Sequence, residues 1–149
     1  MIRTFAFACL LAAVPVSAGA QSPAPAQSKE QVTVEHYYRI KWGSGAEFKR
    51  LYELNHAPLL REMVKTGHIV SIQTEEPFTH MAGGPRWDLR VTITYPNAAS
   101  AVVVGGAFDK AFDAAKARLY PDKKKLDAEE AARFALLEDH WDVIVTSVQ

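Results

Sequence analysis

Histidine is the side chain in this sequence best suited to acid or base chemistry near neutral pH, because an imidazole titrates there without special tuning. His56 lies four residues after Tyr52 and three before Leu59, so it shares the inward stripe of a predicted helix. His36 lies mid-strand, on the face that this helix should cover. We interpret His56 as the first candidate acid or base and His36 as the second. The alternative is that both are core residues with a satisfied hydrogen bond.

Aromatic side chains accompany these histidines. Tyr38 lies on the same strand face as His36 and could orient a histidine, stabilise a developing oxyanion or simply pack. The alternation of the predicted strands places Trp42, Trp87 and Trp141 at one end of the sheet, pointing to its helix-packed side. Together with Tyr52 they are candidate substrate-binding residues of a small-molecule pocket. The alternative is that the tryptophans cap a core.

Hydrophobic periodicity predicts the elements that position these residues. Residues 32–42 alternate as a strand, and a helix is expected over 45–66, kinked or split near Asn55 and His56 because Pro58 removes a backbone donor. Two strands are expected over 68–75 and 87–95. A helix capped by Asn97 follows, which is interrupted at Gly105–Gly106 and ended by Pro121. A shorter helix is expected from Asp127 to about Asp139. The last expected strand is 141–148.

This order, βαββαβ, predicts an α+β protein of the ferredoxin-like class, with a four-stranded antiparallel sheet in the order 4-1-3-2 and its helices on one face. The other face should be polar and aromatic, and a second copy could cover it. Its charges indicate either a compensated dimer interface or an anion-binding cavity, and their near-equal numbers favour the interface. The residues expected on this face are Glu35, Tyr37, Arg39, Ser71, Gln73, Asp88, Arg90, Thr92 and Asp142.

The chain resembles the dimeric α+β barrel superfamily in three segments: Tyr37–Lys41, Glu47–Phe48 and Asn55–Leu59. The His-x-Pro-Leu element at 56–59 is most similar to the EthD-like branch. The resemblance implies a dimeric α+β barrel domain over 32–149 and a homodimer whose two sheets meet face to face. It also implies functions ranging from cofactor-independent oxygenation and lactone isomerisation to haem binding. The long region 121–139 and the N-terminal segment depart from this family pattern.

The N-terminal residues predict export. Arg3 precedes an apolar run, Phe5–Val16, and small residues at Ala18 and Ala20 fit a signal-peptidase site, so residues 1–20 are expected to be a signal peptide. A lipid anchor at Cys9 is the weaker alternative, since the apolar run before it is too short. Residues 21–31 contain no large apolar side chain and are expected to be a disordered linker. The expected location is the periplasm or the secreted fraction.

Composition argues against several functional classes. Lys and Arg number 17 and Asp and Glu also number 17, so no basic surface for nucleic acid or for an anionic membrane is expected. Cys9 is the one cysteine, and it leaves with the signal peptide. No metal site is predicted, because the histidines at 36, 56, 68, 80 and 140 show no paired helical spacing. No cofactor is expected, and only the family resemblance raises haem binding through His56 or His80.

Two functions remain open on the sequence. One is an exported homodimer that binds a small apolar or aromatic molecule and acts on it with His56, His36 and Tyr38, by cofactor-free oxygenation, isomerisation or proton transfer. The other is a periplasmic binding or interaction module without chemistry.

Overall fold

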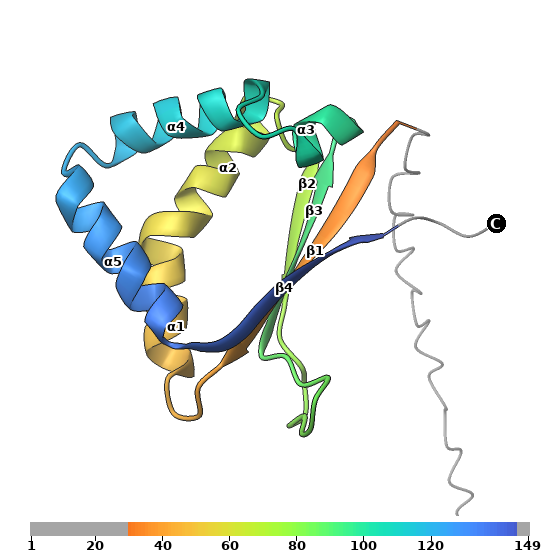
Figure 1. Ribbon diagram of the computed structural model, residues 1–149, viewed down its shortest axis with the longest axis vertical. Coiled ribbons are helices and arrows are strands. Elements are labelled where there is room, and N and C mark those ends of the chain that lie inside the picture. Colours follow the sequence, from red (N-terminus) through yellow and green to blue (C-terminus); the bar gives the residue numbers. More distant parts are fainter. Residues whose placement is uncertain (1–29, 146–149) are drawn as a thin grey trace, which may run out of the picture.

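The structure is a computed structural model that describes residues 30–145. The predicted signal peptide, most of the predicted linker and residues 146–149 lie outside this range. Figure 1 shows the described elements in chain order: β1 (Val32–Ile40), α1 (Gly45–Leu51), the π-helix η1 (Tyr52–His56), α2 (Ala57–Lys65), β2 (Ser71–Glu75), β3 (Leu89–Tyr95), α3 (Ala98–Val102), α4 (Ala107–Leu119), α5 (Lys123–Ala135) and β4 (Leu137–Val145).

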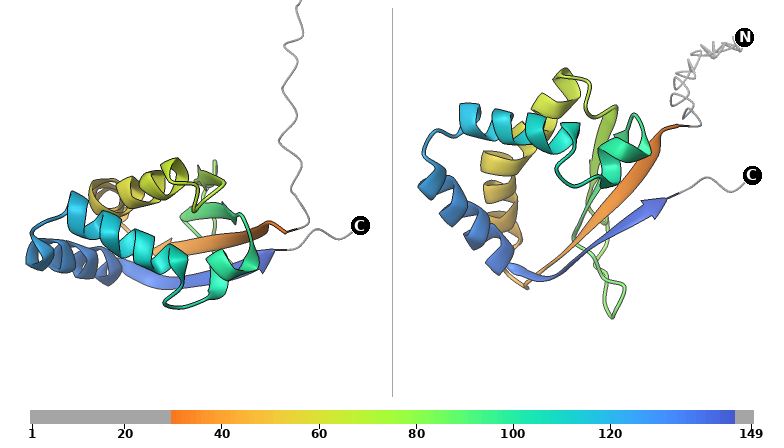
Figure 2. Two further views of the ribbon diagram at one scale, coloured as in Figure 1. Left: turned by 90° about the horizontal axis from the view of Figure 1, so that it is seen from above. Right: turned by 45° about the horizontal axis from the view of Figure 1, so that its top comes forward.

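The four strands form one sheet in the order β2-β3-β1-β4, and every neighbouring pair is antiparallel. Figures 1 and 2 show α1, α2, α4 and α5 on one side of this sheet. The ferredoxin-like fold class, the strand order and the placement of the helices predicted from the sequence are therefore confirmed. Among the described residues, no helix has both the length and the apolar character needed to cross a membrane.

The core lies between the sheet and the helices. Strand β3 shows how the sequence builds this core. Its buried residues alternate with partly exposed ones, and they are Leu89, Val91, Ile93 and Tyr95. A strand with this period presents one apolar face, and helix α2 covers it with buried residues at helical spacing. Those residues of α2 are Leu59, Leu60 and Met63.

The predicted disturbance of the first helix near Asn55 and His56 is confirmed as the π-helix η1, in which the backbone N–H of Ala57 donates to the carbonyl of Tyr52. Pro58 has no N–H to give to the carbonyl of Leu54, four residues earlier. The hydroxyl of Tyr120, in the loop after α4, donates to that carbonyl instead, at 2.9 Å. A side chain distant in sequence thus replaces the bond that proline removes.

The C-terminal elements differ from the sequence prediction. Helix α5 begins at Lys123 rather than Asp127, because Asp122 caps it by accepting the backbone N–H of Lys125 at 2.9 Å. Strand β4 begins at Leu137 rather than Trp141, since pairing with β1 extends as far as Ile40. The strands predicted at 68–75 and 87–95 are also shorter and begin at Ser71 and Leu89.

The register of β4 against β1 reverses a predicted orientation. His36 is opposite Asp142, and Tyr37 is opposite Trp141. Asp142 therefore lies on the helix-covered side and Trp141 on the open side, contrary to the expectation for both. The error arose because the sequence interpretation assigned the large apolar residue of this strand to the core.

The open face of the sheet combines aromatic rings with paired charges. The Tyr37 ring stacks on Trp141 at 5.2 Å between centroids, and the Trp87 ring meets it edge-on at 6.0 Å. Arg90 pairs with Glu75 on β2 and with Glu35 on β1, at 2.5 and 3.7 Å. The charge compensation predicted for this face is present among these residues.

Candidate functional site

A cavity of about 250 Å³ lies between the helices and the sheet. Much of its wall is apolar, from Leu60 on α2, Val91 and Ile93 on β3, and three phenylalanines on α4 and α5, which are Phe108, Phe112 and Phe134. Its polar groups come from β1, β3, the π-helix, α5 and β4. An apolar cavity with a few converging polar groups is the usual form of a small-molecule site.

His36 forms the shortest polar contact at this cavity. Its Nδ1 lies 2.7 Å from Oδ1 of Asp142, its cross-strand neighbour on β4. Because an ionised carboxylate only accepts, Nδ1 carries the proton of a neutral His36, and Nε2 keeps its lone pair. Nε2 is buried and has no hydrogen-bond partner in the described structure. His36 is thus a base whose tautomer is set by Asp142.

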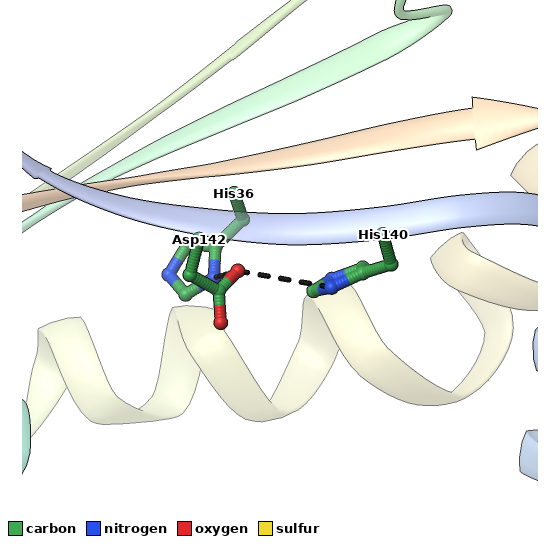
Figure 3. A group of neighbouring side chains, drawn as sticks. All are labelled: His36, His140 and Asp142. Carbon is green, nitrogen blue, oxygen red and sulfur yellow. Dashed lines mark hydrogen bonds and ion pairs between the residues drawn. The ribbon is translucent and has the colours of Figure 1, made fainter.

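His140 completes a cluster with these two residues, drawn in Figure 3 on the side of the strands that faces a helix. Its Nδ1 lies 3.8 Å from the same Oδ1 of Asp142, and its ring centroid is 6.5 Å from that of His36. Burial lowers the pKa of His140, against the opposing effect of the Asp142 charge. The ligand atoms of His36, His140 and Asp142 lie within 4.8 Å of one another, so the cluster could hold a divalent metal ion.

His56, the last residue of η1, also lines the cavity. Its ring lies 5.2 Å from the ring of Tyr52 and 6.4 Å from that of Phe112. Burial, together with the positive charge of Arg133, lowers the pKa of His56 to about 3. His56 is therefore neutral at physiological pH, able to form hydrogen bonds but a weak proton acceptor.

The two predicted tyrosines are buried beside the histidines. Tyr38 lines the cavity and meets the ring of His140 edge-on at 4.3 Å. Burial raises the pKa of Tyr38 to about 12, so its phenol stays protonated and can donate a hydrogen bond. Tyr52 lies behind His56 and Tyr38, outside the cavity wall, and burial raises its pKa as well. The structure thus brings His36, Tyr38 and His56 to one cavity.

The tryptophans do not line this cavity. Trp42 follows β1 and is 69% exposed, while Trp87 and Trp141 contact Tyr37 on the open face. The prediction that all three point to the helix-packed side is therefore wrong. Trp42 and Trp87 instead border a separate hollow of about 230 Å³ at the loop before β3, with Phe78, His80 and Met81.

Haem does not fit the helix-covered cavity. Its volume of about 250 Å³ lies below the ~300–1,000 Å³ typical of drug-sized ligands, and haem is larger than most of these. His80, the other histidine considered for haem, is exposed in the loop before β3.

Three site residues escaped the sequence interpretation: Asp142, His140 and Arg133. The i, i+2 spacing of His140 and Asp142 places both on one face of a strand, which was the available signal. The sequence interpretation missed this signal because it predicted a strand that begins at Trp141 and has the opposite orientation. Arg133 carries no signal, since its helix is predominantly polar.

The sequence matches no protein-family model, and the comparison with curated proteins gives no match. Similarity to solved structures is clear. A NIPSNAP family protein from Agrobacterium tumefaciens is 13% identical, with a TM-score of 0.51 over 86% of this chain and 95% of that chain. A dimeric ferredoxin-like protein of unknown function from Thermobifida fusca is 10% identical, with a TM-score of 0.51 over 85% of this chain and 100% of that one.

A protein of the EthD family from Bacillus halodurans is also similar, at 13% identity and a TM-score of 0.47 over 79% of this chain and 99% of that chain. Identities in this range show the fold alone. The chain has the ferredoxin-like fold of these proteins, as its sequence predicted.

Proposed function

We propose that this protein is a homodimer that binds a small apolar or aromatic molecule in the helix-covered cavity and moves a proton on it with His36. The observation that supports this function best is the His36–Asp142 pair, with an Nδ1–Oδ1 distance of 2.7 Å and a buried, unpartnered Nε2 on the other side of the ring. In this assignment His36 takes the role of base that the sequence analysis gave first to His56.

The chemistry follows from the pair. Nε2 takes a proton from a C–H or O–H group of the substrate, and the charge of the resulting imidazolium is stabilised by the Asp142 carboxylate. Returning the proton to a different atom gives isomerisation. Reaction of the deprotonated substrate with dioxygen gives oxygenation without a cofactor. Both outcomes share the first proton transfer, which is the step we assign.

His56 and Tyr38 complete the site as neutral groups. A neutral His56 does not compete for the proton, because its pKa of about 3 makes it a much weaker base than an ordinary imidazole. Tyr38 keeps its phenol proton, since burial raises its pKa to about 12. We propose that both position the substrate and that Tyr38 donates to an oxygen on which charge develops.

The proposal is tested by solvent deuterium exchange into enolisable aryl ketones, with phenylacetone as the first probe, followed by NMR. The wild-type protein should accelerate exchange above the buffer rate. His36→Gln should abolish the acceleration, and His56→Gln should retain most of it. Loss in His56→Gln with full activity in His36→Gln would reverse the assignment. Binding without any accelerated exchange would favour a non-catalytic binding module.

The metal-binding capacity of the cluster requires a separate control. If His36 acts as a base without a metal ion, the protein should still accelerate deuterium exchange in the presence of a strong chelator. Activity that disappears on chelation and returns with zinc would assign His36, His140 and Asp142 to a metal site. That result would contradict the proposal that His36 acts as a base.

Export remains part of the proposal, on the strength of the N-terminal pattern at residues 1–20. Expression of the full chain in a Gram-negative host, followed by fractionation, should place the protein in the periplasm or medium. Its N-terminus should begin at Gln21. A cytoplasmic protein that retains Met1 would contradict export without affecting the site.

A further inference from the structure

Arg133 is buried in the described structure without an ion pair or a hydrogen bond of its side chain. It lies on α5, lines the helix-covered cavity and is 2% exposed. Its Nε and Nη1 are buried without a hydrogen bond, and no ion pair of its guanidinium is found among residues 30–145. A buried charge that lacks a counter-charge is strongly unfavourable, so such residues are rare unless something else binds them.

The same fold contains a buried arginine with partners, which shows what Arg133 lacks. Arg86 is 4% exposed, yet its Nη2 lies 3.2 Å from a carboxylate oxygen of Asp88 and 3.3 Å from one of Glu138. The carbonyl of Ile40 accepts from the same nitrogen. Arg86 is therefore a structural arginine, whereas the structure leaves the charge of Arg133 uncompensated.

The groups around Arg133 stabilise a cation only in part. Its guanidinium carbon lies 4.6 Å from the ring centroid of Phe134 and 5.9 Å from those of Phe48 and Tyr52. Aromatic faces attract a cation but do not neutralise it. Burial lowers the pKa of Arg133, and Glu130, the acid that opposes this shift, is itself paired with Lys116 at 3.3 Å.

We propose that Arg133 binds the carboxylate of a small apolar or aromatic acid held in the cavity. This inference rests on the proposed function for the ligand pocket and specifies its ligand class. The guanidinium presents a planar set of donors that matches a carboxylate in two parallel hydrogen bonds. The apolar wall of the cavity accepts the rest of the molecule, and the small volume limits that part to about a single ring.

The remaining cavity groups agree with an anionic ligand. His56 is neutral, and the phenol of Tyr38 stays protonated, so neither adds a negative charge. Asp142, an acid in contact with the cavity wall through its bond to His36, has a half-exposed side chain. The guanidinium of Arg133 is therefore the charged group of the described cavity wall that has no counter-charge.

The test compares two carboxylates with their neutral amides by isothermal calorimetry on the purified protein. The probes are benzoate against benzamide, and cyclohexanecarboxylate against its amide. The wild type should bind each carboxylate at least about tenfold more tightly than its amide, because a charge-assisted bond in a buried site is worth a factor of this order. This comparison needs no variant.

Variants then assign the preference to one side chain. Arg133→Met should reduce the preference to within about twofold, and Arg133→Lys should keep part of it, because it retains the charge but not the planar pair of donors. Arg118→Met removes an exposed arginine on α4 and serves as the matched control; it should leave the preference unchanged.

The outcomes separate this inference from the proposed function. Equal binding of acids and amides by the wild type overturns the anion assignment and leaves the pocket in place. A preference that persists in both Arg133→Met and Arg133→Gln also overturns it. Failure of every probe to bind contradicts the small-ligand pocket itself. If the Met variant does not fold, the Gln variant and the wild-type comparison still decide.

Discussion

At the scale of residues, the candidate site depends on how each polar group is partnered. The imidazole of His36 has one bonded nitrogen and one free nitrogen, which is the condition for a directed base. His56 has its ring among aromatic side chains and stays neutral. Residues of the same type thus have different chemistry, because one contacts a carboxylate and the other does not.

Asp142→Asn tests the role of the carboxylate. The amide cannot stabilise the imidazolium, and it can favour the wrong tautomer, so deuterium exchange should slow by about 10²-fold or more. Asp127→Asn, which alters an exposed pair with Lys123, is the matched control and should retain full activity. An active Asp142→Asn protein would show that the pair does not act in proton transfer.

The stability of the fold should depend on pH through His56. Its folded pKa of about 3 is below the ordinary 6.5, so unfolding takes up a proton at intermediate pH. The contribution of His56 is complete above about pH 6.5 and is lost as the pH falls toward 3, by at most about 1.4 kcal/mol per pH unit. Burial depresses this pKa most, followed by the charge of Arg133, with smaller electrostatic effects of His36, Lys116 and His140.

Urea unfolding between pH 7 and pH 4 measures this dependence. The His56→Gln variant should show a flatter profile than the wild type over that range. His80→Gln, which alters an exposed loop histidine, should follow the wild type. Parallel profiles for wild type and His56→Gln would contradict the depressed pKa.

At the scale of elements, the π-helix η1 positions His56. Pro58 has no N–H to donate to the carbonyl of Leu54, and the hydroxyl of Tyr120 donates to that carbonyl from the loop between α4 and α5. This bond ties the end of α4 to η1, the segment that carries His56. The wide turn therefore depends on both local sequence and a distant side chain.

Tyr120→Phe tests this connection. Loss of the hydroxyl should reduce the free energy of unfolding by about 1 kcal/mol in the wild-type background. In the Pro58→Ala background the cost should be smaller, because the new backbone N–H at position 58 can bond the Leu54 carbonyl. Chemical denaturation of the four proteins gives the coupling energy. Equal costs in the two backgrounds would contradict the replacement of one bond by the other.

At the scale of the whole molecule, one face of the sheet is covered by helices and the other is open. The open face carries stacked aromatic rings and compensated charges, the composition of an interface centre with a polar rim. Solved proteins of the same fold are described as dimeric. We propose that a second copy covers this face, on the side of the sheet opposite the cavity.

Trp141→Asp tests the dimer. A carboxylate beside Tyr37 on the open face would be buried without a partner on association, so the variant should be monomeric by light scattering at micromolar concentration. Its far-ultraviolet circular dichroism should remain that of the wild type. Phe78→Ser, which alters a fully exposed loop residue, is the control and should remain dimeric. A monomeric wild type would contradict the dimer at once.

The sequence by itself determined the fold class, the strand order and three residues of the cavity, because alternation and helical spacing are local properties of the chain. His36, Tyr38 and His56 could be assigned to one side of the sheet from their own elements. The interruption of the first helix at Pro58 could also be predicted from the sequence, because proline has no backbone N–H in any structure.

Only the tertiary structure decided which way β4 faces and what its residues meet. The register against β1 turned Asp142 toward His36 and Trp141 toward the open face, and a shift of one residue reverses every side chain of a strand. The sequence also could not show that Arg133 is buried without a counter-charge. Whether a buried charge has a partner depends on residues far apart in the chain, and packing alone brings them together or leaves the charge for a ligand.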